Sequence, residues 1–85
     1  MMELAKVLAR AFASVAVSID LTDDDDIDPD VATEILEPVN ALFRDLSPED
    51  RRTLAAMLVE LSGMETDPVR QASMAQLPDD MGLLD

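Results

Sequence analysis

The chain has 85 residues, of which 48% are hydrophobic, so it is long enough for one small domain and apolar enough to fold. It holds no Cys and no His, which excludes disulfides, thiol catalysis, a histidine base and the commonest zinc ligands. A formal net charge of −13 argues against direct binding to nucleic acid or to an anionic membrane. No stretch reaches the roughly 18 uninterrupted apolar residues of a membrane span. We therefore predict a soluble, cytoplasmic protein with a single domain over residues 1–85.

The first segment, residues 3–19, has the periodicity of an α-helix. Its large apolar residues share one face, and alanines widen the apolar arc to more than half of the circumference. A helix this apolar is predicted either to lie at the centre of a bundle or to bury part of its surface against a second copy of the chain. The β-branched residues within 15–19 leave a short strand as an alternative there. The predicted core face consists of Leu4, Val7, Leu8, Ala11, Phe12, Val15 and Ile19.

An acidic loop over residues 20–28 leads to a second predicted helix over 29–46, whose start is marked by Asp28 as a cap and Pro29 at the first helical position. Pro38 lies inside this helix, where a proline costs about 3 kcal/mol, so it either kinks the helix or divides it. The apolar positions keep one register on both sides of Pro38, which favours a single kinked helix. The arc predicted to face the core contains Val31, Ile35, Leu36, Val39, Leu42, Phe43 and Leu46.

Two further helices are predicted from proline-assisted starts. Ser47-Pro48 begins a helix over 48–62 that ends at Gly63, a residue favoured in the left-handed position after a helix. Asp67-Pro68 begins a short helix over 68–76, which Pro78 is expected to end. The tail, residues 78–85, is either docked on the bundle or available to a partner. The predicted fold is therefore all-α, a small bundle of three to four helices with the second helix kinked at a proline.

The densest charge lies in residues 20–37, which contain nine acids and no base. An EF-hand calcium loop needs Gly at its sixth position and Glu at its twelfth, but a loop that starts at Asp24 has Pro29 and Ile35 there. We therefore predict no metal site, and interpret this segment as an acidic surface that contacts a partner protein. The candidate partner-binding residues are Asp23, Asp24, Asp25, Asp26, Asp30, Glu34 and Glu37.

No catalytic residues and no cofactor are predicted, because the chain lacks a His for a triad and the glycines for a phosphate loop. Its size and acidity resemble those of acyl carrier proteins, but the second helix opens Asp28-Pro29-Asp30, without the serine that carries their prosthetic arm. We expect a non-enzymatic protein that binds a basic protein, such as an immunity protein or antitoxin that occludes a nuclease toxin. The alternative is a structural or regulatory module that forms a homodimer through the first helix and inhibits nothing.

Overall fold

Three of the four helices begin where a side chain caps the first turn and a proline follows it. In the computed structural model, which describes residues 3–84, the Asp28 and Asp67 carboxylates accept hydrogen bonds from the amides of Asp30 and Val69, at 2.8 Å each. The Ser47 hydroxyl oxygen accepts one from the Asp50 amide at 3.1 Å. These bonds satisfy amides that a helix start leaves without a partner. The sequence therefore predicts these three starts correctly.

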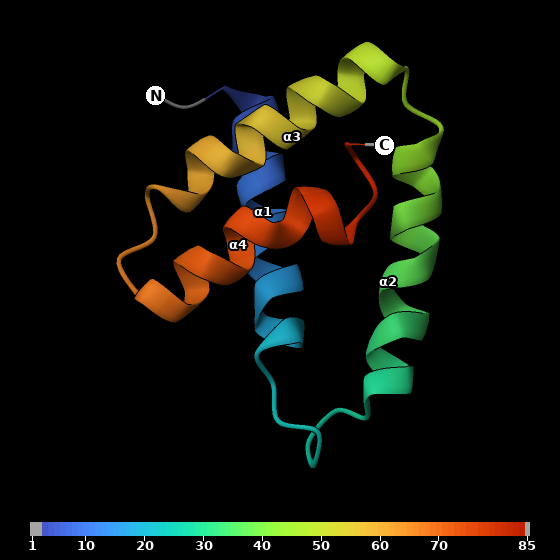
Figure 1. Cartoon of the computed structure of the whole chain (residues 1–85), viewed down its shortest axis with the longest axis vertical. Coiled ribbons are helices and arrows are strands. Elements are labelled where there is room, and N and C mark those ends of the chain that lie inside the picture. Colours follow the sequence, from blue (N-terminus) through green and yellow to red (C-terminus); the bar gives the residue numbers. More distant parts are fainter. Residues whose placement is uncertain (1–2, 85) are drawn as a thin grey trace.

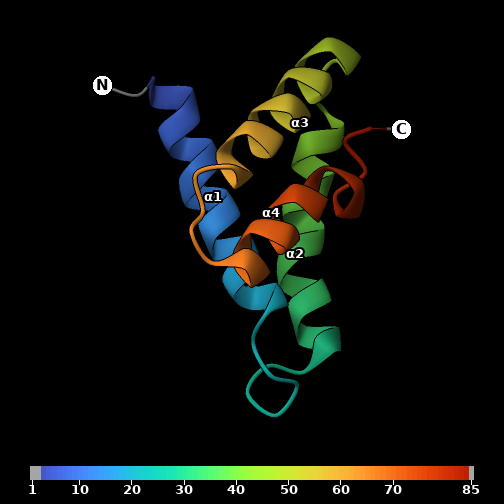
Figure 2. The same ribbon diagram turned by 60° about the vertical axis from the view of Figure 1, so that its left-hand side comes forward.

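The described residues contain four helices and no strand, which confirms the all-α bundle and rules out the strand alternative at 15–19. Figure 1 shows α3 and α4 as an antiparallel pair that crosses one side of α1, while α2 runs beside α1 in the opposite direction; Figure 2 shows the same arrangement after a turn of 60°. No helix within residues 3–84 has the length and apolar character needed to cross a bilayer. The helices are α1 (Leu4–Asp20), α2 (Pro29–Arg44), α3 (Pro48–Ser62) and α4 (Pro68–Asp80).

The core lies where α1, α3 and α4 meet. Leu58 and Leu61 of α3 and Met74 of α4 are at most 2% exposed. The C-terminal tail is docked, since Met81 and Leu83 are also buried. Polar contacts along the edges hold α1 in place, because Lys6 pairs with Glu60 of α3 at 3.2 Å and the Arg70 guanidinium of α4 donates to Ser14 and Ser18 at 3.3–3.4 Å.

The face of α1 that is buried is the opposite of the predicted one. The alanine side of the helix packs against α3 and α4, and its buried residues are Ala9, Ala13, Ala16 and Val17. Of the predicted face, Phe12 and Ile19 are half-buried, whereas the other members are exposed: Leu4, Val7, Leu8, Ala11 and Val15. Two helices crossing one side of α1 approach its axis most closely where side chains are small, so the alanines rather than the leucines take the core position.

Helix α2 contributes no fully buried residue, contrary to the predicted core arc. Leu36, Val39 and Phe43 are half-buried, and the rings of Phe43 and Phe12 meet edge to face with centroids 5.1 Å apart. Three other members of the arc are exposed, namely Val31, Ile35 and Leu42. This apolar arc is wider than the contact that α1 provides, so part of it remains in solvent. The helix is continuous through Pro38, which excludes a break into two helices; the kink stays a prediction.

The C-terminal end of α4 corrects two further predictions. The helix continues through Pro78 to Asp80, because a proline in the last turn removes only one of its hydrogen bonds. The left-handed residue expected at Gly63 is found instead at Gly82, with φ of 68°, whereas Gly63 has φ of −65°. The Leu83 amide donates to the Pro78 carbonyl at 2.9 Å and the Gly82 amide to that of Asp79 at 3.1 Å, a Schellman motif that turns Leu83 into the core.

Candidate functional site

The predicted acidic loop is a folded and solvent-exposed turn. Asp23, Asp24, Asp25 and Asp26 are all exposed at the end of the molecule where α1 leads into α2, at the bottom of Figure 1. The Asp23 carbonyl accepts hydrogen bonds from the amides of Asp26 at 2.9 Å and Ile27 at 3.0 Å, which closes the turn. Among residues 3–84 the single ion pair joins Lys6 to Glu60, so none of the four loop carboxylates is paired there.

The remaining predicted residues continue from this loop onto one side of α2. Asp30, Glu34 and Glu37 recur at three- and four-residue intervals, so they share one side of the helix, and all three are exposed. The structure therefore places the seven predicted acids on one loop and the helix that follows it. We call these residues the acidic surface. No cluster of three His, Cys, Asp or Glu side chains arranged to hold a metal ion occurs in the described part of the chain.

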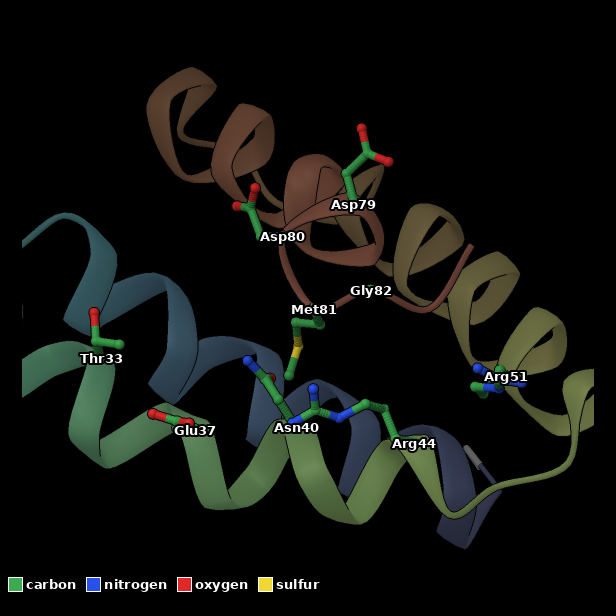
Figure 3. Close-up of a pocket in the computed structure, with 9 residues that line it drawn as sticks. All are labelled: Thr33, Glu37, Asn40, Arg44, Arg51, Asp79, Asp80, Met81 and Gly82. Atoms are coloured by element: carbon green, nitrogen blue, oxygen red, sulfur yellow. The ribbon is translucent and has the colours of Figure 1, made fainter. Parts of the chain in front are cut away.

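A polar cleft separates α2 from the C-terminal end of α4, with a volume of about 500 Å³ (Figure 3). Arg44 and Asn40 reach into it from α2, near the thioether of Met81. The Asn40 Oδ1 and Arg51 Nε atoms are buried and have no hydrogen-bond partner within residues 3–84. The lining residues are Thr33, Glu37, Asn40, Arg44, Arg51, Asp79, Asp80, Met81 and Gly82.

The charged groups around this cleft have opposite signs. Two guanidinium groups, three carboxyl groups and the Thr33 hydroxyl line it. The arginines are suited to a carboxylate or phosphate, but Glu37, Asp79 and Asp80 oppose an anion at the same place. Of the nine lining residues the sequence indicated only Glu37 as a site residue.

Among the described carboxyl groups, Asp80 has the pKa that the fold shifts most clearly. Burial raises the pKa of Asp80 by disfavouring its charged form, and the nearby carboxylates Asp20 and Asp79 raise it further. Asp20 accepts a hydrogen bond from the Ser73 hydroxyl at 2.8 Å, which holds this carboxylate beside α4. No local pattern in the sequence indicates this contact, because Asp20 and Asp80 lie on different helices.

We expect Asp80→Asn to raise the melting temperature at pH 7. A carboxyl whose pKa is raised in the folded state destabilises the fold while it is ionised. This destabilisation declines as the pH falls through the raised pKa. It vanishes below the pKa of the carboxyl in the unfolded chain, which is about 3.9. The advantage of the variant should therefore shrink from pH 7 toward pH 4. Thermal melts across this range measure it. Asp25→Asn, which removes one charge from the exposed loop, is the matched control, and an equal gain from both variants would contradict a local effect at Asp80.

A third feature is the set of large aliphatic side chains that α1 and α2 leave exposed. We define the α1–α2 apolar face by the large aliphatic side chains that both helices leave exposed: Leu4, Val7, Leu8, Val15, Val31, Ile35 and Leu42. No titratable residue is among them. The apolar periodicity of the sequence predicts a core position for all seven, which is wrong. The signal for the buried side of α1 is its alanine stripe, since small residues permit the closest helix packing.

Comparison with protein-family models, with curated proteins and with solved structures found no match to this chain. The geometry described above leaves three candidate contact regions: the acidic surface, the polar cleft and the α1–α2 apolar face. The acidic surface carries exposed carboxylates without paired bases, whereas the cleft sets opposite charges against each other. The acidic surface and the apolar face are therefore the two regions suited to a macromolecular partner.

Proposed function

We propose that this chain is a small acidic protein that binds and occludes a basic partner protein, as an immunity protein or antitoxin occludes a nuclease toxin. The observation that carries this proposal is the acidic surface, in which seven exposed carboxylates lie on one loop and one side of the adjoining helix. The sole ion pair of the described residues, Lys6–Glu60, neutralises none of them. In this proposal the protein acts in the cytoplasm and has no enzymatic activity.

The chemistry of such a partner follows from the charge. A protein that binds nucleic acid presents Lys and Arg side chains to the phosphates, and closely spaced carboxylates offer those side chains similar charge-assisted contacts. Opposite net charges also accelerate encounter between two proteins, which favours rapid neutralisation of a toxin. The two hydrogen bonds to the Asp23 carbonyl hold the loop in a turn, so less conformational freedom is lost when it binds.

The acidic loop is expected to set the association rate. The variant with Asp23→Asn, Asp24→Asn, Asp25→Asn and Asp26→Asn removes four charges from exposed positions and little shape. Exposed charges act mainly on the association rate and its salt dependence. At low salt we therefore expect the variant to associate with the partner about tenfold more slowly than the wild type, and its association rate to depend less on salt concentration. Co-purification with mass spectrometry identifies the partner, and stopped-flow binding at two salt concentrations measures the rates.

A matched control removes four exposed carboxylates from other elements, through Asp45→Asn, Glu49→Gln, Asp50→Asn and Asp79→Asn. Both variants change the net charge equally, so a specific role of the loop requires the loop variant to associate more slowly than the control. Equal association rates for the two variants would show that only the net charge matters, not the position of the carboxylates. Association rates unchanged from the wild type would refute the proposal for this loop. Circular dichroism checks that both variants keep their helices.

The α1–α2 apolar face favours a second proposal, that the chain is a homo-oligomerising structural or regulatory module. Leu4 is 75% exposed and Leu8 is 60% exposed, and both belong to the first helix, for which contact with a second copy is predicted. A monomer that is stable in water seldom exposes this many large aliphatic side chains on two neighbouring helices unless they contact a partner. The molecular mass of the wild-type chain under native conditions tests this proposal independently of any basic partner.

A further inference from the structure

We propose that the polar cleft between α2 and the end of α4 binds a short peptide whose amino and carboxyl termini are both free. The carboxylate of the peptide lies at Arg44 and Arg51, and its ammonium group lies at Glu37 and Asp80. The cleft has a volume of about 500 Å³, within the range of about 300–1,000 Å³ that is usual for small-ligand sites. This inference goes beyond both proposed functions and rests on neither of them.

The opposite charges of the cleft do not pair with one another. Two guanidinium groups and three carboxyl groups line the same cavity, yet the sole ion pair among residues 3–84 joins Lys6 to Glu60. Neither Arg44 nor Arg51 is therefore ion-paired in the described part of the chain. A zwitterion satisfies both signs, because its anionic end suits the guanidinium groups and its cationic end suits the carboxylates.

Two buried polar atoms of the cleft residues also need a partner. Asn40 Oδ1 only accepts hydrogen bonds and Arg51 Nε only donates them, and neither atom has a partner within residues 3–84. A buried polar atom without a hydrogen bond costs free energy, which a ligand recovers when it supplies the missing bond. A free peptide supplies both kinds of bond, since its N–H groups donate and its terminal carboxylate accepts.

The order of these groups along the cleft sets the direction and the length of the ligand. Four lining residues recur on α2 at intervals of four, three and four positions and share one side of the helix: Thr33, Glu37, Asn40 and Arg44 (Figure 3). Arg51 follows in the first turn of α3. Glu37 and Arg44 are seven residues, or roughly 10 Å, apart along α2. An extended chain covers about 3.3–3.6 Å per residue, so a tripeptide matches this separation.

A second cavity locates the ammonium end. The cleft and an adjoining cavity of about 330 Å³ share Asp80 and Asn40 among their lining residues. The adjoining cavity also reaches Leu36, so Asp80 lies near residues 36–40 of α2, at the end of the cleft that holds Glu37. Burial and neighbouring carboxylates raise the pKa of Asp80, and a cation beside this group would favour its charged form. The acids therefore gather at one end of the cleft and the arginines at the other.

Titration of the isotope-labelled full chain with trialanine, followed by NMR, tests this site. We expect saturable shifts of the Asn40, Arg44 and Arg51 signals. N-Acetyl-trialanine lacks the ammonium group and trialanine amide lacks the carboxylate. Each should bind about tenfold more weakly than trialanine, because one hydrogen-bonded charge is lost. No saturable shift up to about 10 mM trialanine, or equal affinity for the three peptides, would overturn the proposal.

Matched variants test the two ends of the site separately. Arg44→Gln should weaken trialanine binding about tenfold but leave the binding of trialanine amide unchanged, because the amide lacks the group that Arg44 contacts. Glu37→Gln should likewise weaken trialanine but not its acetylated form. The controls are Arg52→Gln and Glu34→Gln, at exposed positions that do not line the cleft. Equal losses in cleft and control variants, or equal losses for free and blocked peptides, would overturn the proposal.

Two simpler zwitterions test whether the ligand is a peptide. 6-Aminohexanoate separates an ammonium group from a carboxylate but has no peptide N–H to donate to Asn40, so we expect it to bind several-fold more weakly than trialanine. Free alanine carries both charged groups on one carbon atom and cannot reach both ends of the cleft, so its titration should not saturate. Affinity equal to that of trialanine for either compound would overturn the assignment of a peptide.

Discussion

Leu58→Asp is expected to unfold the protein. Leu58 is 0% exposed at the centre of the core between α1, α3 and α4. Losing the packing of a buried leucine costs about 2–5 kcal/mol, and burying an unpaired carboxylate adds several kcal/mol more. A small domain has a total stability of about 5 kcal/mol at the lower end of the usual range, so the variant should not fold. Loss of the helical circular dichroism signal at room temperature measures the effect.

The control for this prediction is Leu42→Asp, the same change at a mid-helix leucine that is 67% exposed. The apolar periodicity of α2 placed Leu42 in the core, where aspartate would also have unfolded the chain. Because Leu42 is in solvent, the aspartate keeps its hydration, and we expect helicity to be retained at low protein concentration. An unfolded Leu42→Asp variant together with a folded Leu58→Asp variant would show that α2, rather than α3, forms the core.

Ala13→Leu is expected to destabilise the protein by about 3 kcal/mol, which lowers the melting temperature by roughly 10–20 °C. Ala13 is 0% exposed on the buried side of α1, the helix that packs against α3 and α4. Three added carbon atoms cannot be accommodated there without moving a helix or forcing strained rotamers. Thermal melts followed by circular dichroism measure the change.

Ala56→Leu, at an exposed position in the middle of α3, is the matched control. Leucine and alanine have similar helix propensities, so this substitution tests whether the added volume matters only in the core. We expect a melting temperature within a few degrees of the wild type. If Ala13→Leu were as well tolerated as Ala56→Leu, the alanine side of α1 would not be buried. The leucine side predicted from the sequence would then be the side that packs in the core.

Local sequence signals accounted for where helices begin. Ser47-Pro48 and Asp67-Pro68 supply both a capping oxygen and a residue with the φ that a first helical turn requires, and these requirements involve only neighbouring residues. The acidic surface could also be predicted, because carboxylates crowded in sequence on a loop and one helix side remain crowded in space. Helix ends were predicted less well, since the left-handed turn at Gly82 forms only because the tail docks in the core.

The assembly of the candidate sites depended on contacts between distant segments. The polar cleft brings α2, α3 and the end of α4 together, and the pKa of Asp80 depends on Asp20, which lies nearby in space at the end of α1 but 60 residues away in sequence. Neither contact leaves a periodic or local signal in the sequence. The α1–α2 apolar face likewise exists only because α3 and α4 cover the other side of α1.

The sequence by itself determined an all-α chain, three of its helix starts and a charge of −13 concentrated around one loop. Tertiary structure alone decided which side of α1 is buried. The helix has a leucine and valine side and an alanine side with the same periodicity, so amphipathicity cannot choose between them. Two helices pack across α1, and close approach of helix axes requires small side chains, so the alanine side enters the core and the larger side chains remain in solvent.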